Sequence, residues 1–379
     1  MRIQIDGAGT VNKGAELMLY AILEQIEQKY PKAKIIFNTL QNNKSIITDL
    51  DLKQPFYLKH NHFFVTVSSR LKIPLHNLFT EFHPKGKSDL VLDASGFRHG
   101  DQWNLPVSYF MKLDKYYKHL KRNNSKIILL PQAFGPFITT NSKIGVEIIN
   151  KYADMIIARD SVSKNHLLST GCNENKIYQF PDFTILTNGK FPEIFNNLKD
   201  GVCIIPNIRM MTHSDVVIED YITFVDEIHR ICQQNGKKLF LLNHEGDDDL
   251  NVCKEINKKL ENKLPIVTNL DAKETKGIIG QSYLVISSRY HGVANALGQS
   301  IPCFATSWNH KYETLFNDFG LNECIIDIKN NLDLSIKKID NYLQPSQNRK
   351  IKNILRGKGN IIIEETNLMW KTIWSKVSE

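Results

Sequence analysis

Residues 283–311 read YLVISSRYHGVANALGQSIPCFATSWNHK, and this stretch decides the fold. It opens with an apolar run over Tyr283–Ile286, which is short enough for a buried strand. A helical pattern begins at Gly292 and ends before Pro302, and a second short apolar run follows. This order is that of a β-α-β unit, in which ligands bind at the carboxyl ends of the strands.

Arg289 and His291 fall at the carboxyl end of the first of these strands, where the helix begins. A guanidinium group can bind a phosphate or a carboxylate with two hydrogen bonds, and a helix N-terminus also favours an anion. An imidazole can exchange a proton near neutral pH. Either residue alone is more typical of a surface charge or of a satisfied polar side chain. The two together at this position predict an active site.

The composition is that of a globular protein with room for two domains. The chain has 379 residues, of which 42% are hydrophobic and 23% are charged, and its formal net charge is +8. The basic residues form no dense run, so nucleic-acid binding is possible but not indicated. An anionic substrate or an anionic membrane surface fits this charge equally well.

The six cysteines show no CxxC spacing, and we expect buried free thiols. No histidine has metal-site spacing with a partner acid, so we expect no metal. The N-terminus lacks the apolar region of a signal peptide, and no apolar run approaches the length of a spanning helix. We therefore expect a cytoplasmic protein.

The N-terminus starts with a predicted strand at Ile3–Asp6, a glycine turn and a helix over about residues 14–30. The turn lacks the third glycine of the dinucleotide fingerprint, because Asn12 stands there, and it lacks the lysine of the phosphate loop. Two interpretations remain open: the turn brings Asn12 near a ligand, or it is only a tight turn that needs glycine.

Polar residues recur where the predicted strands end. In the first half of the chain they are Asp93, Gln132 and Arg159. In the second half they are Arg209 and His244, besides Arg289 and His291. Because the carboxyl ends of parallel strands lie on one edge of a sheet, each half should carry one polar edge.

The alternation of strands and helices predicts two Rossmann-like α/β domains that face each other across a cleft, a glycosyltransferase-B-like fold. We place the first domain at residues 1–180 and the second at residues 198–345. Residues 346–379 should form a helical segment that either crosses back to the first domain or caps its own. Residues 41–88 carry no assignable pattern, and we interpret them as a loop-rich insertion.

Residues 287–298, SSRYHGVANALG, followed by Lys311, resemble the hallmark of the polysaccharide pyruvyl transferase family. Weaker matches are GAGTVNKGAELML at residues 7–19, ARDSVS at residues 158–163, and Pro181-Asp182. The resemblance covers most of the chain. It implies the two-domain fold and a reaction in which the enolpyruvyl group of phosphoenolpyruvate is transferred to two hydroxyls of one sugar. The product would be a cyclic pyruvate ketal, with release of phosphate.

In that reaction we assign His291 as the general acid that protonates the methylene carbon of the donor. Phosphoenolpyruvate carries a phosphate and a carboxylate, and it should need more than one cation. Our candidates are Arg289, Arg159 in the RD motif, Arg209 as its competitor, and Lys311. The remaining candidates for substrate binding are His244, Asn12, Ser288 and Asp93. The base for the sugar hydroxyl is open between Asp93, Asp101 and Asp182, each of which is more typical of a structural residue.

We expect no cofactor besides phosphoenolpyruvate as donor substrate. The acceptor should be a sugar in a polysaccharide or a lipid-linked precursor, bound by the first domain. A lipid-linked acceptor would bring the enzyme to the inner membrane surface. The acidic run at residues 247–249 could be a metal site for a nucleotide sugar, but it is more typical of a solvated loop.

Three other functions stay open. A sugar-nucleotide-dependent glycosyltransferase shares the expected fold, but it gives no role to a second cation such as Arg159. A non-catalytic carbohydrate-binding protein would not need Arg289 and His291 for chemistry. Nucleic-acid binding comes last, because no aromatic and basic motif supports it.

Overall fold

The computed structural model describes residues 1–10, 12–38, 87–212, 214–306 and 311–379. These residues form two compact units. Unit 1 consists of residues 1–11, 18–184 and 365–379, and unit 2 consists of residues 12–17 and 185–364. The predicted insertion at residues 41–88 lies outside the described residues, except for its last two.

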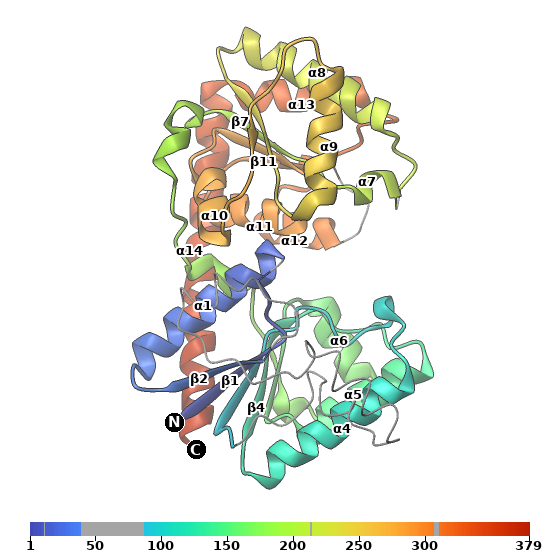
Figure 1. Cartoon of the computed structure of the whole chain (residues 1–379), viewed down its shortest axis with the longest axis vertical. Helices are drawn as coiled ribbons and strands as arrows, with labels where there is room; N and C mark the ends of the chain where they lie inside the picture. Colours follow the sequence, from blue (N-terminus) through green and yellow to red (C-terminus); the bar gives the residue numbers. More distant parts are fainter. Residues whose placement is uncertain (11, 39–86, 213, 307–310) are drawn as a thin grey trace, which may run out of the picture. The chain divides into compact units, whose positions relative to one another are not determined.

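Unit 1 is built on a parallel six-stranded sheet (Figure 1) with the order β2-β1-β3-β4-β5-β6. The strands are β1 (Arg2–Asp6), β2 (Lys34–Asn38), β3 (Leu90–Asp93), β4 (Lys126–Gln132), β5 (Met155–Ala158) and β6 (Ile177–Gln179). The strand order reverses between β1 and β3, which is where ligands bind in open α/β sheets. Gly7 follows β1 with a φ of +76°, and a Cβ there would come within 2.1 Å of Ser95 Oγ, so this turn requires glycine.

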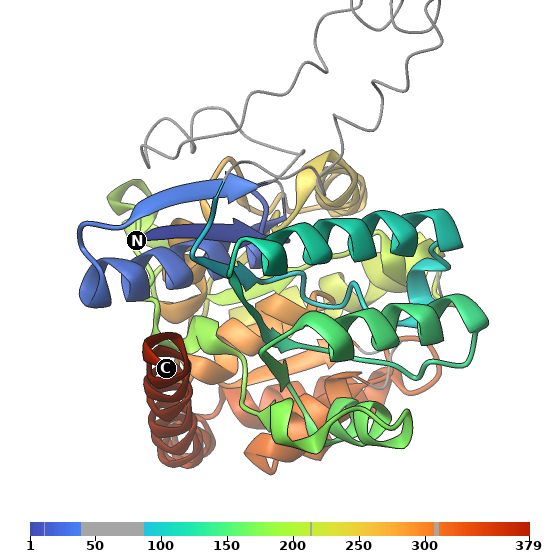
Figure 2. The same ribbon diagram turned by 90° about the horizontal axis from the view of Figure 1, so that it is seen from below.

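Helices cover both faces of this sheet, which is why its strands are mostly buried and rich in apolar residues. Figure 2 shows α4 and α5 along one face, with α1 and the end of α14 on the other. The helices are α1 (Lys13–Lys29), α4 (Val107–Arg122), α5 (Thr140–Tyr152), α6 (Ser161–Ser169) and the end of α14 (Pro345–Ser378). The chain thus returns to unit 1 through its last helix, where Trp374 packs on Tyr30 with ring centroids 5.5 Å apart.

Unit 2 contains a second parallel six-stranded sheet, with the order β12-β11-β10-β7-β8-β9. The strands are β7 (Val202–Ile205), β8 (Leu239–Leu242), β9 (Ile266–Val267), β10 (Leu284–Ser287), β11 (Cys303–Thr306) and β12 (Ile325–Ile326). The order of this sheet is that of a dinucleotide-binding fold, and it reverses between β7 and β10. The predicted β-α-β unit is therefore confirmed, and its first strand lies at the switch point. Two parallel α/β sheets confirm the predicted fold class.

The helices of unit 2 cover its sheet and bury a single large apolar core. They are α7 (Arg209–Thr212), α8 (Ile218–Gln234), α9 (Gly246–Lys259), α10 (Ala272–Gly280), α11 (Tyr290–Gly298), α12 (Lys311–Phe319), α13 (Leu332–Leu343) and most of α14. Across both units, short 3-10 helices occur at Asp101–Trp103, Glu174–Lys176, Phe183–Leu186, Glu193–Leu198 and Asn322–Cys324. The small residues of α11 allow close packing, since a Cβ on Gly292 would lie 2.3 Å from Ser287 Oγ.

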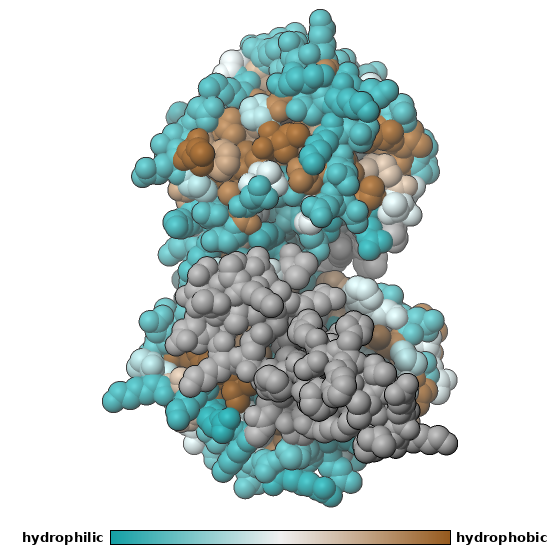
Figure 3. Space-filling view, viewed as in Figure 1, coloured by the Kyte–Doolittle hydropathy of each residue, from teal (hydrophilic) through white to brown (hydrophobic). Residues whose placement is uncertain are grey.

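The surface of unit 2 and the cysteines of the chain are those of a globular protein. On the face of unit 2 that is visible in Figure 3, hydrophilic residues dominate and apolar residues lie between them. All six cysteines are buried and free, as expected. No helix among the described residues combines the length and the apolar character that crossing a bilayer would require.

Candidate active site

The site of unit 2 is assembled at the carboxyl ends of β7 and β10, the two strands that flank the switch point. Asn207 follows β7 and donates from Nδ2 to the carbonyl of Ser288 at 3.0 Å, which ties the two strand ends together. Asn207 is 4% exposed, so this bond lies inside the protein. The loops that carry Arg209 and Arg289 therefore start from one fixed point.

Two serines hold the turn that leads from β10 into α11. Ser287 Oγ donates to the Arg289 carbonyl at 2.9 Å and accepts from the Arg289 N–H at 3.0 Å. Ser288 is fully buried, and its hydroxyl lies 2.6 Å from Thr306 Oγ1 and 2.9 Å from Tyr221 Oη. We predicted Ser288 as a substrate-binding residue, but its burial and its partners fit a residue that positions the Arg289 backbone.

Arg289 is the N-cap residue of α11, in extended conformation, and its guanidinium group lies between two carboxylates. Nε donates to Asp249 Oδ2 at 2.7 Å, and Nη1 donates to Glu245 Oε2. Burial alone would lower the pKa of Arg289, but the hydrogen bond and charge of Asp249, with the charge of Glu245, outweigh it and raise the pKa. Arg289 is therefore permanently cationic and has a fixed orientation.

The two carboxylates differ in their access to solvent. The Asp249 side chain is 0% exposed, and its second oxygen accepts from the Ile208 N–H at 3.1 Å. The Glu245 side chain is 26% exposed. Burial raises the pKa of Asp249, and Arg289 opposes this effect. Asp249 is thus an internal partner of Arg289, whereas Glu245 is the partner that is open to solvent.

Asn12 connects the start of α1 to this ion-pair group. Its Oδ1 accepts from the N–H groups of Gly14 at 2.9 Å and Ala15 at 3.1 Å, which caps α1. Its Nδ2 donates to Glu245 Oε1 at 2.6 Å. Asn12 therefore caps a helix and also contacts Glu245, and its predicted nearness to a ligand stays a prediction.

His291 lies in the first turn of α11, two residues after Arg289. A Cβ added to Gly14 would come within 2.2 Å of His291 Nδ1, so the imidazole packs directly on the backbone of α1. The Tyr290 ring lies edge-on at 5.5 Å between centroids. The glycine at position 14 leaves the space that the imidazole needs.

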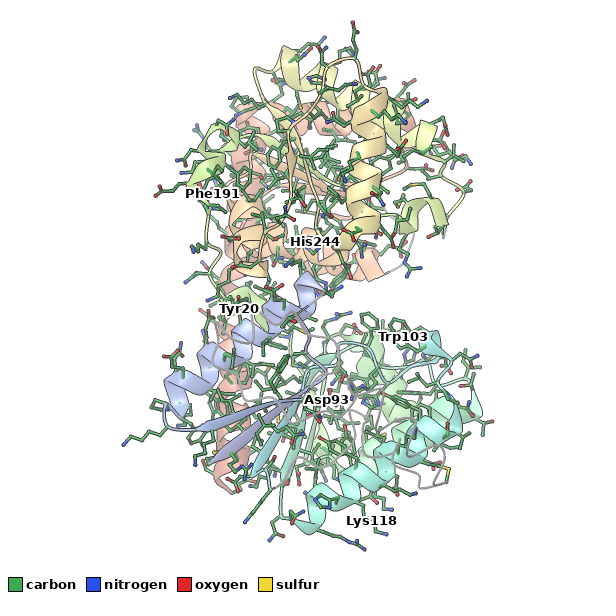
Figure 4. All side chains as sticks on the ribbon, viewed as in Figure 1. Tyr20, Asp93, Trp103, Lys118, Phe191 and His244 are labelled. Atoms are coloured by element: carbon green, nitrogen blue, oxygen red, sulfur yellow. The ribbon has the colours of Figure 1, made fainter. Side chains whose placement is uncertain are left out.

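His244 follows β8 (Figure 4). It is 3% exposed, and neither ring nitrogen has a hydrogen-bond partner among the described residues. Burial lowers the pKa of His244 well below its ordinary value, and the positive charges of Arg289, His291 and Lys13 act in the same direction. His244 is therefore neutral at pH 7. A buried imidazole without hydrogen-bond partners among the described residues is suited to a ligand that supplies hydrogen bonds.

The other predicted residues are spread over both units. Arg209 begins α7 in unit 2 and is exposed, while Lys311 begins α12 and its side chain lies outside the described residues. Arg159 follows β5 in unit 1, and its N–H donates to the Gln132 carbonyl at 2.9 Å. The structure thus brings Asn12, His244, Arg289 and His291 together in unit 2, whereas Arg159 and Asp93 belong to unit 1.

Asp93 ends β3 and is fully buried (Figure 4). Its carboxylate accepts from Ser95 N at 2.9 Å, from Ser95 Oγ, from Tyr117 Oη at 3.1 Å and from Arg98 Nη1 at 3.4 Å. Burial alone would raise the pKa of Asp93, but the charges of Arg98 and His99 and the bonds from Ser95 lower it. A carboxylate with these donors is better suited to holding the β3 loop than to accepting a substrate proton.

The other two candidate bases also have structural partners. Asp101 accepts from Ser142 Oγ at 2.6 Å and from the N–H and hydroxyl of Thr139, and these bonds lower its pKa although desolvation opposes them. Asp182 accepts from the N–H of Thr184 at 2.9 Å and from its hydroxyl at 2.7 Å. Both aspartates fix the chain at the start of a helical turn.

The prediction of a solvated loop at residues 247–249 is wrong for Asp249. These residues form the first turn of α9, and Asp249 lies inside the protein while Asp247 and Asp248 are exposed. The physical reason is the charge of Arg289, which compensates the buried carboxylate. Among the described residues, no group of three or more His, Cys, Asp or Glu side chains could hold a metal ion.

Comparisons with known proteins agree with this fold. The chain is similar to the UDP-GlcNAc 2-epimerase of Neisseria meningitidis bound to UDP-GlcNAc, with 13% identity, a TM-score of 0.61, and coverage of 99% of this chain and 100% of that chain. It is also similar to Anabaena HepE in complex with UDP and glucose, with 12% identity, a TM-score of 0.59, and coverage of 100% and 99%. At these identities the likeness concerns the fold alone, which is glycosyltransferase-B-like.

No curated protein sequence matches the chain significantly. The sequence profile of one family, described as polysaccharide pyruvyl transferase, matches residues 12–310. That range begins at the residue that caps α1, and it includes Glu245, Asp249, Arg289 and His291. It covers far more than half of the 379 residues. The chain belongs to the polysaccharide pyruvyl transferase family.

Proposed function

We propose that the protein transfers the enolpyruvyl group of phosphoenolpyruvate to two hydroxyls of a sugar and that unit 2 binds the donor. The observation that carries this proposal is the position of Arg289 and His291 on the first turn of one helix, at the switch point of a parallel sheet. An anion bound by Arg289 would lie beside an imidazole that can exchange a proton.

Binding of the donor uses the permanent charge of Arg289. A guanidinium group forms its strongest hydrogen bonds with carboxylates and phosphates, and it already binds two carboxylates here. The donor would replace the partly exposed Glu245 and leave the buried Asp249 in place. Neutral His244 would donate one hydrogen bond to the donor, which gives its unpartnered ring a function. Arg209 and Lys311 remain further candidates for the second anionic group.

The proposed reaction begins with transfer of a proton from the His291 imidazolium to the methylene carbon of phosphoenolpyruvate. The neighbouring carbon becomes electrophilic, and a sugar hydroxyl adds to it while its proton returns to the imidazole. The carbon–oxygen bond to phosphate then breaks, and the second hydroxyl adds to the same carbon. Its proton leaves with the phosphate, so that the products are a cyclic pyruvate ketal and inorganic phosphate.

Unit 1 offers features for a sugar. Phe97 and Trp103 stack with their centroids 5.6 Å apart at an interplanar angle of 9°, and they are 38% and 55% exposed. Flat exposed aromatic rings suit the apolar faces of sugar rings. Near them His99 is buried and its ring nitrogens have no partner within the described chain, while Arg98 pairs with Asp93. We assign the acceptor to this region, and we keep Arg159 as a candidate for binding an anion.

The direct test incubates the full chain with phosphoenolpyruvate and a panel of lipid-linked sugars. The expected result is release of phosphate together with an acceptor whose mass increases by one pyruvate ketal. A parallel reaction with UDP-sugars tests the glycosyltransferase alternative. Transfer of a sugar from UDP, without any reaction of phosphoenolpyruvate, would refute the proposal.

Two variants test the residue roles. His291→Ala should bind phosphoenolpyruvate but lose at least a hundredfold in turnover, because general acid catalysis contributes about that factor or more. Arg289→Lys should weaken donor binding, because an ammonium group cannot form the paired hydrogen bonds of a guanidinium group. His229→Ala, at a partly exposed position on α8, is the matched control. Retention of most of the turnover by His291→Ala would remove His291 from the mechanism.

Trp103→Ala tests the acceptor region. It should raise the KM for the sugar and leave the dissociation constant of phosphoenolpyruvate unchanged. An equal loss for both substrates would contradict the assignment of Trp103 to the acceptor.

A further inference from the structure

The positive charge of the chain is concentrated on one helix more than the overall composition indicates. Residues 345–363, the first part of α14, contain no Asp or Glu. The same segment carries Arg349, Lys350, Lys352, Arg356 and Lys358. These residues form no consecutive basic run, because they are spaced along a helix. All of them belong to unit 2.

Three of these cations line a cavity. Arg349, Lys352 and Arg356 are spaced by three and four residues, which places them on one side of the helix. With Tyr283 they line a cavity of about 410 Å³ whose other walls include Pro345, Asn348 and Asn353. The cavity therefore presents guanidinium and ammonium groups from a single rigid element.

The base of this cavity is an aromatic ring that already has cationic neighbours. Lys237 Nζ lies 3.5 Å from the Tyr283 ring centroid, and Lys352 Nζ lies 5.3 Å from it. The acid at this place is Asp200, which binds Lys237 at 2.5 Å. Burial lowers the pKa of Lys352, and the charges of Lys237 and Arg356 contribute in the same direction while Asp200 opposes them. An anion in the cavity would relieve this crowding of positive charge.

A second side of the same helix mixes cations with exposed apolar residues. Lys350, Ile354, Lys358 and Ile361 follow at helical spacing, and the two isoleucines are 39% and 53% exposed. Between this side and the cavity, the helix is anchored in the core of unit 2 through Ile351 and Leu355, which are 3% and 0% exposed. The helix thus exposes cations on both of these sides and apolar residues on one of them, on a fixed support. We call these two sides together the α14 surface.

We propose that the α14 surface binds a membrane that contains anionic phospholipids, with a lipid phosphate in the cavity of Arg349, Lys352 and Arg356. Cations attract the anionic headgroups, and exposed isoleucines insert into the boundary between headgroups and acyl chains. The apolar residues favour a bilayer over a nucleic acid, whose contacts are phosphates and stacking aromatic rings. Tyr283 is 8% exposed and cannot stack on a base.

The test measures co-sedimentation of the full chain with vesicles of phosphatidylcholine alone and with vesicles of equimolar phosphatidylcholine and phosphatidylglycerol. The wild-type protein should bind the anionic vesicles, and added salt should weaken that binding. The triple variant Arg349→Gln, Lys352→Gln, Arg356→Gln should bind them at least tenfold more weakly. The variant Lys254→Gln, Lys258→Gln, Lys259→Gln removes the same charge from exposed positions of α9 and should bind nearly as well as the wild type.

Further measurements distinguish the other ligands. The variant Ile354→Ser, Ile361→Ser should also weaken vesicle binding, because it removes the apolar contacts and no charge. Equal binding to both kinds of vesicle, or equal binding by the two triple variants, would overturn the proposal. Binding of inorganic phosphate or duplex DNA by the cavity, without binding of the vesicles, would also overturn the proposal.

The proposal does not depend on the pyruvyl transfer chemistry. Both triple variants should unfold at the temperature of the wild type and should transfer pyruvate to a water-soluble sugar at the wild-type rate. Loss of that reaction in the wild type would refute the proposed function and leave the membrane test intact.

Discussion

Asp249→Asn and Glu245→Gln remove the same charge from the two sides of Arg289, and we predict opposite effects on donor binding. Asp249 is fully buried and fixes the guanidinium group through Nε at 2.7 Å. Glu245 is partly exposed, binds Nη1, and occupies the place that a donor anion would take. Asp249→Asn should therefore weaken the binding of phosphoenolpyruvate, whereas Glu245→Gln should strengthen it.

The magnitudes follow from burial. A hydrogen bond to a charged group contributes about 1.5–3 kcal/mol, so a misplaced guanidinium group should weaken donor binding roughly ten- to a hundredfold in Asp249→Asn. Loss of one partner of a buried ion pair should also lower the free energy of unfolding by about 3 kcal/mol, because the Arg289 charge stays inside. Glu245 is more solvated, and removal of its repulsion should be worth about 1 kcal/mol, or roughly fivefold tighter binding.

Isothermal titration calorimetry with phosphoenolpyruvate measures both effects, and thermal unfolding separates binding from folding. Asp248→Asn is the matched control, because it removes an exposed charge from the same turn of α9. It should change the dissociation constant by less than about twofold. Tighter binding by Asp249→Asn would show that Asp249 only repels the donor, and it would refute the positioning role.

Gly14→Ala should reduce pyruvyl transfer by about a hundredfold, because the new Cβ would lie 2.2 Å from His291 Nδ1 and would displace the imidazole. Gly357→Ala is the control: its Cβ would meet no atom within 4 Å, so it should keep the wild-type rate. Asp6 is buried, and desolvation and then the charge of Asp93 raise its pKa from 3.8 to about 6. The stability that Asp6 contributes is therefore fully present below its unfolded pKa and is lost as the pH rises through about 6. Relative to the wild type, Asp6→Asn should therefore gain about 3 kcal/mol in the free energy of unfolding between about pH 4 and pH 7, measured by chemical denaturation; a constant difference would contradict the raised pKa. The six buried thiols should react with a thiol reagent only after unfolding, because burial raises the pKa of thiols such as Cys232 and Cys253; rapid reaction of the native protein would contradict this.

The part of the site that the sequence predicts is the part that local pattern determines. Arg289 and His291 follow a short apolar run and begin a helix of small residues, so their place at a strand end can be inferred from one continuous stretch. The strand order of each sheet cannot be inferred in this way. The position of β10 next to β7, which makes the turn after it a switch point, results from pairing between strands about eighty residues apart.

The partners of Arg289 could not be predicted from such a local pattern, because they lie 40 and 44 residues away along the chain. One signal was nevertheless present. Asp249 precedes Val252, Cys253 and Ile256 at spacings of three, four and seven residues, which is the apolar side of an amphipathic helix. A carboxylate on that side is buried, and a buried carboxylate requires a cation or several donors.

The position of Arg289 between an internal and a partly exposed carboxylate has a consequence for the proposed binding of an anionic donor. A partly buried guanidinium group with unpaired N–H groups would be costly, and Glu245 supplies a second partner besides Asp249 when no donor is bound. A phosphate or carboxylate of the donor can replace Glu245 without any net loss of charge pairing at Arg289. Asn12 Nδ2, at 2.6 Å from the other oxygen of Glu245, can keep a hydrogen bond to the displaced side chain. Replacing Glu245 by the donor should therefore cost less free energy than removing water from a fully solvated arginine. Asp249 would keep the orientation of the guanidinium group during this replacement.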